Sequence, residues 1–270
     1  MSSNNHLKPT LFQPPLVGGI APNRESKITR IYAHRGANKE AAENTRTAFE
    51  RALHYPIDGI ETDIQLTRDG VPVLWHDDDF AKLGHADKRV DDFDFAQLQT
   101  LNFAAHFAGA EKESAMNLQD FVTAYHARCD LLLEIKRYSN ESQVQQHSKV
   151  RQTLSIAQAV NSERIMASSF DLDSLLYAQQ IAPNFPLVFN LEPEHNVVFA
   201  IQALQQQPFL QGLCVHIATL DAAMMAAVRQ RGKSIAVYTC NTDEQIDRAL
   251  HLGVDVLISD FPQRALHRRA

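Results

Sequence analysis

Two carboxylates stand two residues apart inside a largely apolar stretch near the start of the chain. Glu61 and Asp63 lie within residues 59–66, together with Ile60, Ile64 and Leu66. Side chains two apart in an extended strand point to the same face, so both carboxylates share one side of the strand. Buried carboxylates are costly unless they are paired or bound to a cation. The spacing predicts a site for Mg²⁺ or Ca²⁺, and a pair of structural salt bridges is the alternative.

Two histidines follow short apolar runs on either side of this pair. His34 and Arg35 come directly after the run 31–33, and His76 comes directly after the run 71–75. A histidine can act as an acid or a base near neutral pH, and an arginine can clamp a phosphate through two hydrogen bonds. These residues predict acid-base chemistry on a phosphate. An ordinary loop at a strand end and a surface histidine are the alternatives.

A third apolar run ends in alternating charges. Glu134 and Lys136 follow residues 131–133, which are all leucine. A core strand has no use for this pattern, whereas a cation site next to a phosphate would use both groups. Glu134 is therefore predicted as a third carboxylate for the metal and Lys136 as a cation for the phosphate. An internal Glu–Lys ion pair is the alternative.

Strand-like and helix-like patterns alternate from residue 28 onward. The runs typical of buried strands are 31–33, 59–66, 71–75, 131–135, 165–168, 187–190, 213–217, 235–239 and 254–259. The amphipathic stretches between them are 45–53, 118–126, 141–160, 171–180, 195–207, 220–231 and 242–251. With 71–75 taken as an extra strand paired with its neighbour, eight strands remain, which predicts an α/β fold of the (β/α)₈ TIM barrel type. The competing open sheet usually carries a GxGxxG turn after its first strand, and that motif is absent.

The domain organisation follows from the same patterns. Residues 1–28 are polar and punctuated by proline and glycine, and we expect an N-terminal arm that is flexible or loosely docked. Residues 29–270 form one barrel in this interpretation. Residues 77–117 are too long for an ordinary strand-to-helix connection, so they predict an insertion on the catalytic rim, with a short helix near 95–101.

Composition excludes several classes of protein. The formal net charge is −6 and no basic stripe is visible, which argues against a nucleic-acid partner. No apolar run approaches the ~20 residues of a membrane span, and no signal peptide is recognisable. The three cysteines are far apart, which predicts buried free thiols in a reducing compartment. We expect a cytoplasmic protein acting on a small molecule, and the oligomeric state stays open.

In order and spacing, these motifs resemble the glycerophosphodiester phosphodiesterase family. The resemblance rests on HRG, ENT, ExD, TxDG, HD and ExK, which here are 34–36, 43–45, 61–63, 67–70, 76–77 and 134–136. It continues through 168–171, Asn241, 253–255 and 259–262, and so covers roughly residues 30–262. The sequence departs from the family where the seventh strand usually ends in WTVN, because here it reads Tyr238-Thr239-Cys240-Asn241.

The resemblance implies metal-dependent hydrolysis of a glycerophosphodiester to sn-glycerol 3-phosphate and an alcohol. One Mg²⁺ or Ca²⁺ would be bound by three carboxylates, and His34 and His76 would form the acid-base pair. Which histidine is the acid stays open, as does direct attack by water against a cyclic phosphate. The implied roles are metal binding for Glu61, Asp63 and Glu134, phosphate binding for Arg35 and Lys136, and secondary contacts for Asn44, Phe170, Tyr238, Asn241 and Trp75.

Three other functions fit parts of the pattern. A related barrel could act on lysophospholipids as a lysophospholipase D, or on another phosphodiester or cyclic phosphate. A barrel without catalysis could serve as a binding scaffold, but a scaffold would not need every charged residue of the motifs. The alcohol group stays open, because the region expected to select it, 77–117, resembles the family least.

Overall fold

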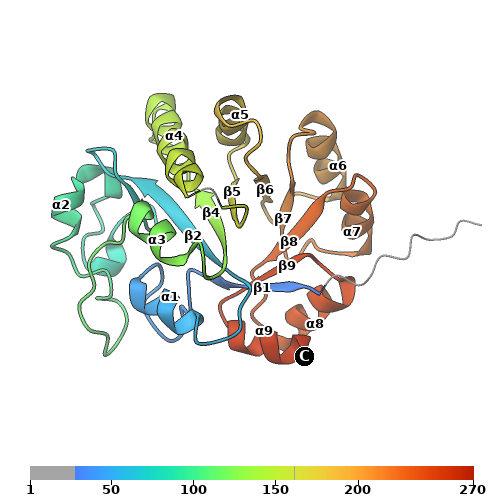
Figure 1. Cartoon of the computed structure of the whole chain (residues 1–270), viewed down its shortest axis with the longest axis horizontal. Helices are drawn as coiled ribbons and strands as arrows, with labels where there is room; N and C mark the ends of the chain where they lie inside the picture. Colours follow the sequence, from blue (N-terminus) through green and yellow to red (C-terminus); the bar gives the residue numbers. More distant parts are fainter. Residues whose placement is uncertain (1–27, 161) are drawn as a thin grey trace, which may run out of the picture.

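A closed barrel of eight parallel strands forms the centre of the molecule, and helices surround it (Figure 1). The computed structural model describes residues 28–160 and 162–270. The sheet runs in the order β1-β9-β8-β7-β6-β5-β4-β2-β3, and pairing of β1 with β2 closes it. The strands are β1 (Arg30–His34), β2 (Gly59–Leu66), β3 (Pro72–Leu74), β4 (Asp130–Ile135), β5 (Ile165–Ser169), β6 (Leu187–Leu191), β7 (Gly212–His216), β8 (Ser234–Tyr238) and β9 (Val256–Ser259). The predicted TIM barrel is confirmed, including the extra strand β3, which pairs antiparallel with β2.

Helices follow the strands in the predicted places. They are α1 (Arg46–Ala52), α2 (Phe95–Leu98), α3 (Leu118–Tyr125), α4 (Gln143–Ala159), α5 (Leu172–Ile181), α6 (Val197–Gln206), α7 (Ala222–Arg229), α8 (Asp243–Leu252) and α9 (Pro262–Arg269). Polar N-cap residues start many of them. Asn117, Asp171 and Thr242, for example, each accept a hydrogen bond from a free backbone N–H of the first turn. The helix α9 was not predicted.

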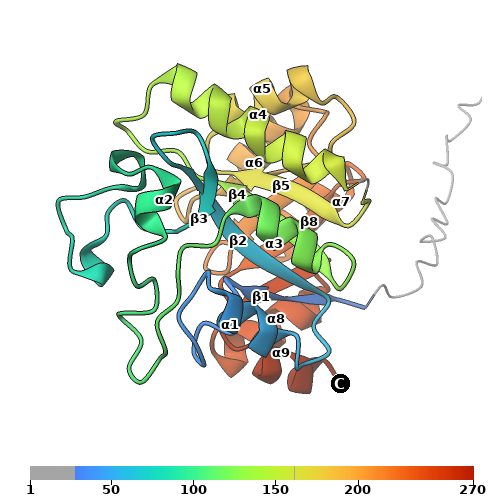
Figure 2. The ribbon, with the colours of Figure 1, turned by 60° about the vertical axis from the view of Figure 1, so that its left-hand side comes forward.

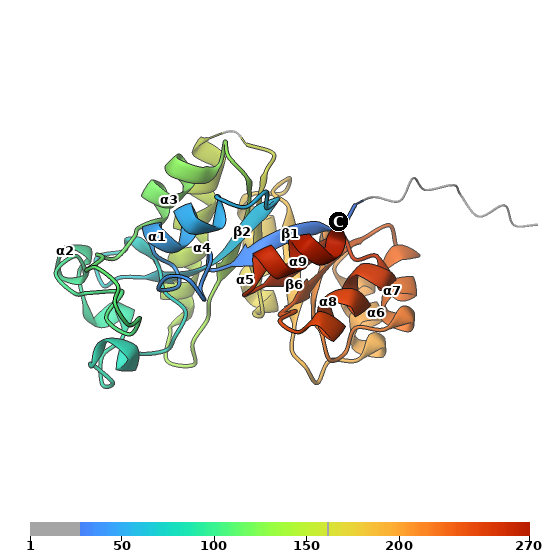
Figure 3. The same cartoon turned by 90° about the horizontal axis from the view of Figure 1, so that it is seen from below.

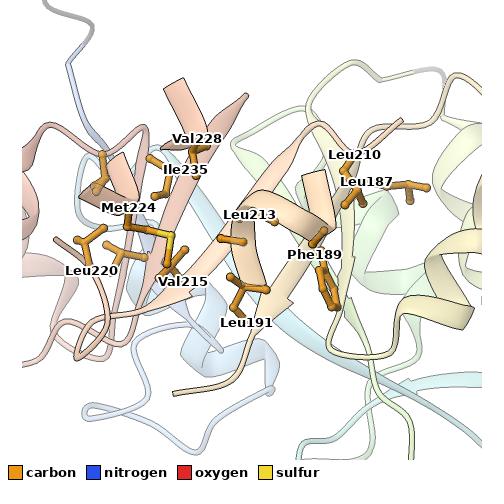
Figure 4. Close-up of a cluster of buried hydrophobic side chains, with 14 of the residues drawn as sticks. Leu187, Phe189, Leu191, Leu210, Leu213, Val215, Leu220, Met224, Val228 and Ile235 are labelled. Atoms are coloured by element: carbon orange, nitrogen blue, oxygen red, sulfur yellow. The ribbon is translucent and has the colours of Figure 1, made fainter. Parts of the chain in front are cut away.

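Alternation along the strands separates the apolar core from the polar interior of the barrel. On β2, Ile60 and Ile64 pack outward against the helices, whereas Glu61 and Asp63 face inward. Apolar side chains such as those of Tyr32 and Leu132 close the amino-terminal end of the interior. Another part of the outer core lies between β6, β7, β8 and α7 (Figure 4), and its labelled members are Leu187, Phe189, Leu191, Leu210, Leu213, Val215, Leu220, Met224, Val228 and Ile235. The carboxyl ends of the strands are left as the polar end, where side chains can meet a ligand.

The segment predicted as an insertion forms a lobe beside the barrel (Figure 2). It contains two 3₁₀ turns, η1 (Ala81–Leu83) and η2 (Val90–Asp92), and the short helix α2. A small core of its own holds it, in which Trp75 and Phe80 lie 5.0 Å apart between ring centroids. Trp75 is buried in this core, and its Nε1–H donates to the Asp79 carbonyl at 3.1 Å.

Three further predictions concern the chain as a whole. The predicted arm, residues 1–28, lies outside the described residues except for residue 28. Cys129, Cys214 and Cys240 are buried free thiols, as predicted, and burial raises the pKa of Cys129 to about 12. Among the described residues, no helix combines the length and the apolar character needed to cross a membrane.

Candidate active site

Three carboxylates converge inside the barrel at its carboxyl end. Glu61 and Asp63 come from β2 and Glu134 from β4, and one oxygen of each lies within 4.8 Å of the others. The pairing register explains the meeting, because Asp63 lies opposite Glu134 in the parallel ladder. Glu61 Oε2 and Asp63 Oδ1 are buried, and neither accepts a hydrogen bond from the described residues. Buried carboxylate oxygens without donors fit a bound cation.

The charges in this group are unevenly balanced. Burial raises the pKa of Glu61 well above its usual range, and the neighbouring Asp63 and Glu134 raise it further. Burial acts in the same direction on Asp63, but Arg35 and Lys136 outweigh it and hold the pKa of Asp63 below its usual range. A divalent cation would remove the repulsion between the three groups. The three oxygen donors suit a hard cation such as Mg²⁺ or Ca²⁺.

Two largely buried cations border the carboxylates. Arg35 Nε lies 3.0 Å from Asp63 Oδ2, and its Nη1 lies 3.1 Å from Glu43 Oε2. Lys136 Nζ lies 2.8 Å from Glu134 Oε1 and 3.7 Å from Asp63 Oδ1. Both cations therefore lie beside the carboxylate group, where an anionic ligand would meet them. Glu43 belongs to the ENT motif but was not among the predicted site residues.

Both predicted histidines have a carboxylate at Nδ1. His34 Nδ1 lies 2.6 Å from Asp260 Oδ1, and His76 Nδ1 lies 2.7 Å from Asp77 Oδ1. This arrangement fixes the ring and leaves Nε2 available, and His34 Nε2 points toward Glu61 at 3.8 Å. Burial would raise the pKa of Asp260, but its contacts with His34 outweigh burial and lower it. Asp77 and Asp260 lie in the motifs 76–77 and 259–262, but neither was among the predicted site residues.

Amide side chains support the carboxylates. Asn44 Nδ2 donates to Asp63 Oδ2 at 3.0 Å, and Asn241 Nδ2 donates to Asp260 Oδ2 at 2.9 Å. Asn190 Nδ2 donates to Glu134 Oε2 at 3.2 Å. The two asparagines named from the sequence thus contact acidic groups of the site. Asn190 was missed, and its only signal is a polar residue within the apolar run of β6.

Strained backbone occurs at the same place. Arg35 and Asn44 have positive φ angles of 56° and 57°, which residues other than glycine rarely adopt. The two are joined, because the Asn44 N–H donates to the Arg35 carbonyl at 3.1 Å. Such strain persists only where the surrounding structure enforces it, and it concentrates at functional sites. It supports a functional reading of the β1–α1 loop.

A cavity of about 560 Å³ opens from this group toward solvent. Its walls include His76, Lys136, Tyr138, Phe170 and Glu192. Phe170, a secondary candidate, lines the cavity directly. Tyr238 stands behind it with the ring centroids 5.7 Å apart, and the Tyr238 hydroxyl donates to the Leu191 carbonyl at 2.6 Å. The volume suits a small molecule.

Comparison with known proteins identifies the family. The model of the glycerophosphoryl diester phosphodiesterase family matches residues 34–264. A glycerophosphodiester phosphodiesterase of Bacillus altitudinis is 29% identical over 253 residues, which cover 90% of this chain and 98% of that protein.

Solved structures share the fold. An Oleispira antarctica phosphodiesterase in complex with the product sn-glycerol-3-phosphate superposes with a TM-score of 0.76 at 20% identity, covering 89% of this chain and 96% of that one. A glycerophosphodiester phosphodiesterase from Parabacteroides distasonis gives 0.75 at 20% identity, covering 90% and 98%. The family model spans the barrel from His34 into α9, and the chain therefore belongs to the glycerophosphoryl diester phosphodiesterase family.

Proposed function

We propose that this chain hydrolyses a glycerophosphodiester to sn-glycerol 3-phosphate and an alcohol, with one divalent cation bound by Glu61, Asp63 and Glu134. The observation that carries the proposal is the group of three converging carboxylates, in which the buried Glu61 and Asp63 each keep an oxygen without a hydrogen-bond donor among the described residues. Arg35 and Lys136 border this group. The product bound to the Oleispira antarctica neighbour supports the choice of substrate.

The phosphate would lie over the carboxylates. A cation held by Glu61, Asp63 and Glu134 would supply positive charge to the phosphate and would make a nearby hydroxyl more acidic. Arg35 and Lys136 would donate hydrogen bonds to the same oxygens and stabilise the additional charge of the transition state.

The histidines would exchange the protons. One Nε2 accepts the proton of the attacking oxygen while that oxygen bonds to phosphorus. The other Nε2 donates a proton to the alkoxide as the bond from phosphorus to the alcohol breaks, which matters because an alcohol is a poor leaving group without a proton. Asp77 and Asp260 would keep each Nδ1 protonated, and so leave each Nε2 free to accept or donate. Attack by water and attack by the neighbouring glycerol hydroxyl are both compatible with this assignment.

A water-soluble diester fits the cavity better than a lysophospholipid. The large hydrophobic side chains that are exposed in the described part of the chain are Ile28, Val144, Ile181 and Val198, and none of them lines the cavity. A long acyl chain would need an apolar groove, so a lysophospholipase D activity is the less supported candidate. Residues 29–270 would act as a single barrel domain carrying the 77–117 insertion.

Release of glycerol 3-phosphate tests the proposal. We expect release from glycerophosphocholine or glycerophosphoethanolamine with Mg²⁺ or Ca²⁺, loss after chelation, and less activity on lysophosphatidylcholine. Glu61→Gln should abolish the activity that depends on the added metal. Unchanged turnover after complete chelation would contradict the metal site, and turnover of lysophosphatidylcholine alone would contradict the substrate.

A further inference from the structure

The cavity contains two carboxylates that the proposed reaction does not use, Asp171 and Glu192. Glu192 follows β6 and lines the cavity with Phe170 and Asp171. Asp171 is already engaged, because it accepts from the Ser174 N–H at 3.0 Å and lies 3.5 Å from Arg137 Nη1. No salt bridge within the described residues involves the side chain of Glu192. The carboxylate of Glu192 is therefore available to a ligand.

The backbone around Glu192 is firmly held. The Glu192 N–H donates to His195 Nδ1 at 3.1 Å, and the His195 N–H donates back to the Glu192 carbonyl at 3.0 Å. The His195 ring stacks on Phe199 with centroids 3.8 Å apart, and the Tyr238 hydroxyl anchors the preceding Leu191 carbonyl. These contacts hold the backbone of Glu192 in place at the cavity wall.

We propose that the outer part of this cavity binds a cationic alcohol group, and that Glu192 and Phe170 give a preference for glycerophosphodiesters of amino alcohols such as choline and ethanolamine. An aromatic ring and a carboxylate together are the groups that recognise an organic cation. The position agrees with the reaction, because the same cavity reaches His76 and Lys136. This inference rests on the proposed function and specifies its substrate.

Substrates whose alcohol groups differ in charge distinguish a cation subsite at Glu192 from a role of Glu192 in the turnover of every substrate. The experiment compares kcat/KM for three diesters. Glycerophosphocholine and glycerophosphoethanolamine have a cationic alcohol group, and glycerophosphoglycerol has an uncharged one. In the wild type, the two cationic substrates should be preferred. Glu192→Gln should lower their kcat/KM about fivefold, the effect of an ion pair partly open to solvent, and leave glycerophosphoglycerol unchanged. Glu194→Gln, which removes an exposed charge two residues away, is the matched control and should keep the preference.

Three results would overturn the inference. The wild type could cleave all three diesters without preference, Glu192→Gln could keep the preference, or it could lose activity on all three alike. Each of these leaves the proposed function standing. A wild type that cleaves none of the three diesters would instead overturn the proposed function itself, and the inference with it.

A separate observation concerns Lys82, which belongs to η1 of the lobe. Its Nζ lies 2.7 Å from Glu43 Oε1 and 2.9 Å from Asp77 Oδ2. The opposite oxygens of these carboxylates contact the site, since Asp77 Oδ1 is 2.7 Å from His76 and Glu43 Oε2 is 3.1 Å from Arg35. Lys82 therefore joins the two acidic groups that hold a predicted catalytic histidine and a predicted phosphate-binding arginine.

The lobe fixes Lys82 in place. Phe80 is buried against Trp75, and its N–H donates to the Lys88 carbonyl at 2.9 Å. The 3₁₀ turn closes with the Gly84 N–H donating to Ala81 at 3.0 Å. Independently of the subsite above, we infer that Lys82 is a positioning residue, which orients His76 through Asp77 and Arg35 through Glu43.

Removal of the ammonium group tests this role. Lys82→Met should lower kcat about tenfold, the usual effect of losing a supporting contact of a functional group, with KM changed less than twofold. Lys82→Arg should restore most of the turnover, and Lys88→Met, on the same lobe, is the control. The ¹H resonance of the His76 Nδ1–H should move upfield in Lys82→Met, because Asp77 is no longer fixed.

The resonance does not depend on turnover, so it keeps the inference testable if the proposed substrate is wrong. A wild-type resonance position together with a wild-type kcat in Lys82→Met would overturn the inference. A raised KM with unchanged kcat would also overturn it, because Lys82 would then act on substrate binding alone.

Discussion

The two histidines share one arrangement, although His34 ends β1 and His76 lies in the loop after β3. Each ring contacts a carboxylate through Nδ1, Asp260 for His34 and Asp77 for His76. A carboxylate partner fixes the tautomer, orients the ring and stabilises the charged imidazolium. Both rings are thus prepared to hold a proton at Nδ1 and exchange one at Nε2. In the proposed reaction, the side of the substrate that each ring faces would decide which one acts as the acid and which as the base.

Truncation of either ring tests the assignment. His34→Ala and His76→Ala should each lower kcat by ~10²-fold or more, the typical contribution of acid-base catalysis. Both side chains are partly exposed, so the barrel should remain folded by circular dichroism. His54→Ala, at an exposed position after α1, is the control. Normal turnover in both site variants would rule out the acid-base pair.

Asp77 makes part of the stability depend on pH. Burial would raise the pKa of Asp77, but hydrogen bonds from His76 and Lys82 outweigh burial and hold it at about 2. A carboxyl whose pKa is lower in the folded chain stabilises the fold above its unfolded pKa, ~3.9, and this contribution disappears as the pH falls through 2.

We therefore expect Asp77→Asn to be less stable than the wild type near pH 6, with the difference shrinking as the pH falls below 4. Urea unfolding at several pH values measures it. Asp87→Asn, whose side chain is 84% exposed, should show no such trend. A difference that grows toward low pH would contradict the assignment.

The sequence predicted the three carboxylates and two of the supporting asparagines, Asn44 and Asn241, but not the other supports. Glu61, Asp63 and Glu134 could be found because period-two spacing in a strand is a local signal. Asp260 could not be assigned to His34, since the two are 226 residues apart and meet only after the barrel closes. Asn190 was hidden for the same reason, as its partner Glu134 lies two strands away in the sheet.

At the scale of elements, the turn from β1 into α1 sets the position of His34 and Arg35. Gly36 has a φ of 83°, and a Cβ at this position would lie 2.7 Å from the Ala48 carbonyl carbon in α1. Only glycine allows this approach of loop and helix. The start of the same loop is also held against β2, because the Arg35 N–H donates to the Glu61 carbonyl at 2.9 Å.

Gly36→Ala should lower the free energy of unfolding by about 3 kcal/mol, since it adds a steric clash to an unfavourable φ. Gly84→Ala is a matched control, because Gly84 has a φ of 84° with no atom near the added Cβ, and it should cost about 1 kcal/mol. Denaturant unfolding measures both. Equal losses would show that the contact with α1 is unimportant.

Most strands and helices could be predicted because burial on one or both faces leaves a period in the sequence. The prediction of residues 59–66 as a strand matches β2, and 118–126 differs from α3 by one residue. The turns η1 and η2 have no such period and were not predicted. The helix α9 was not among the predicted helices, because its residues are mostly polar or charged and leave only a weak apolar period, although Pro262 in its first turn is a start signal.

At the scale of the whole molecule, a cation would connect two strands that are far apart in the chain. Glu61 and Asp63 lie on β2 and Glu134 on β4, with β3 and the lobe between them in sequence. An ion that binds only the folded chain stabilises the entire barrel, by about 2.7 kcal/mol at a concentration 100 times its dissociation constant.

Thermal melts should therefore show a rise in Tm when Mg²⁺ or Ca²⁺ is added to chelator-treated protein. Glu61→Gln should show little or no rise, whereas Glu194→Gln should respond like the wild type. An equal rise in all three proteins would mean that the cation binds elsewhere. The same titration shows which of the two ions binds more tightly.

The first strand of the barrel is completed by the last. β1 pairs with β2 on one side and β9 on the other, and α9 lies against β1 with Arg269 bonded to the Thr29 carbonyl at 3.0 Å (Figure 3). Along the chain, the three carboxylates come before residue 135, whereas Asp260 follows β9. An unfinished chain would therefore have its acidic residues without the partner of His34. A chain cut before residue 256 would lack both the strand that completes β1 and the carboxylate that holds His34, so we expect it to be neither folded nor active.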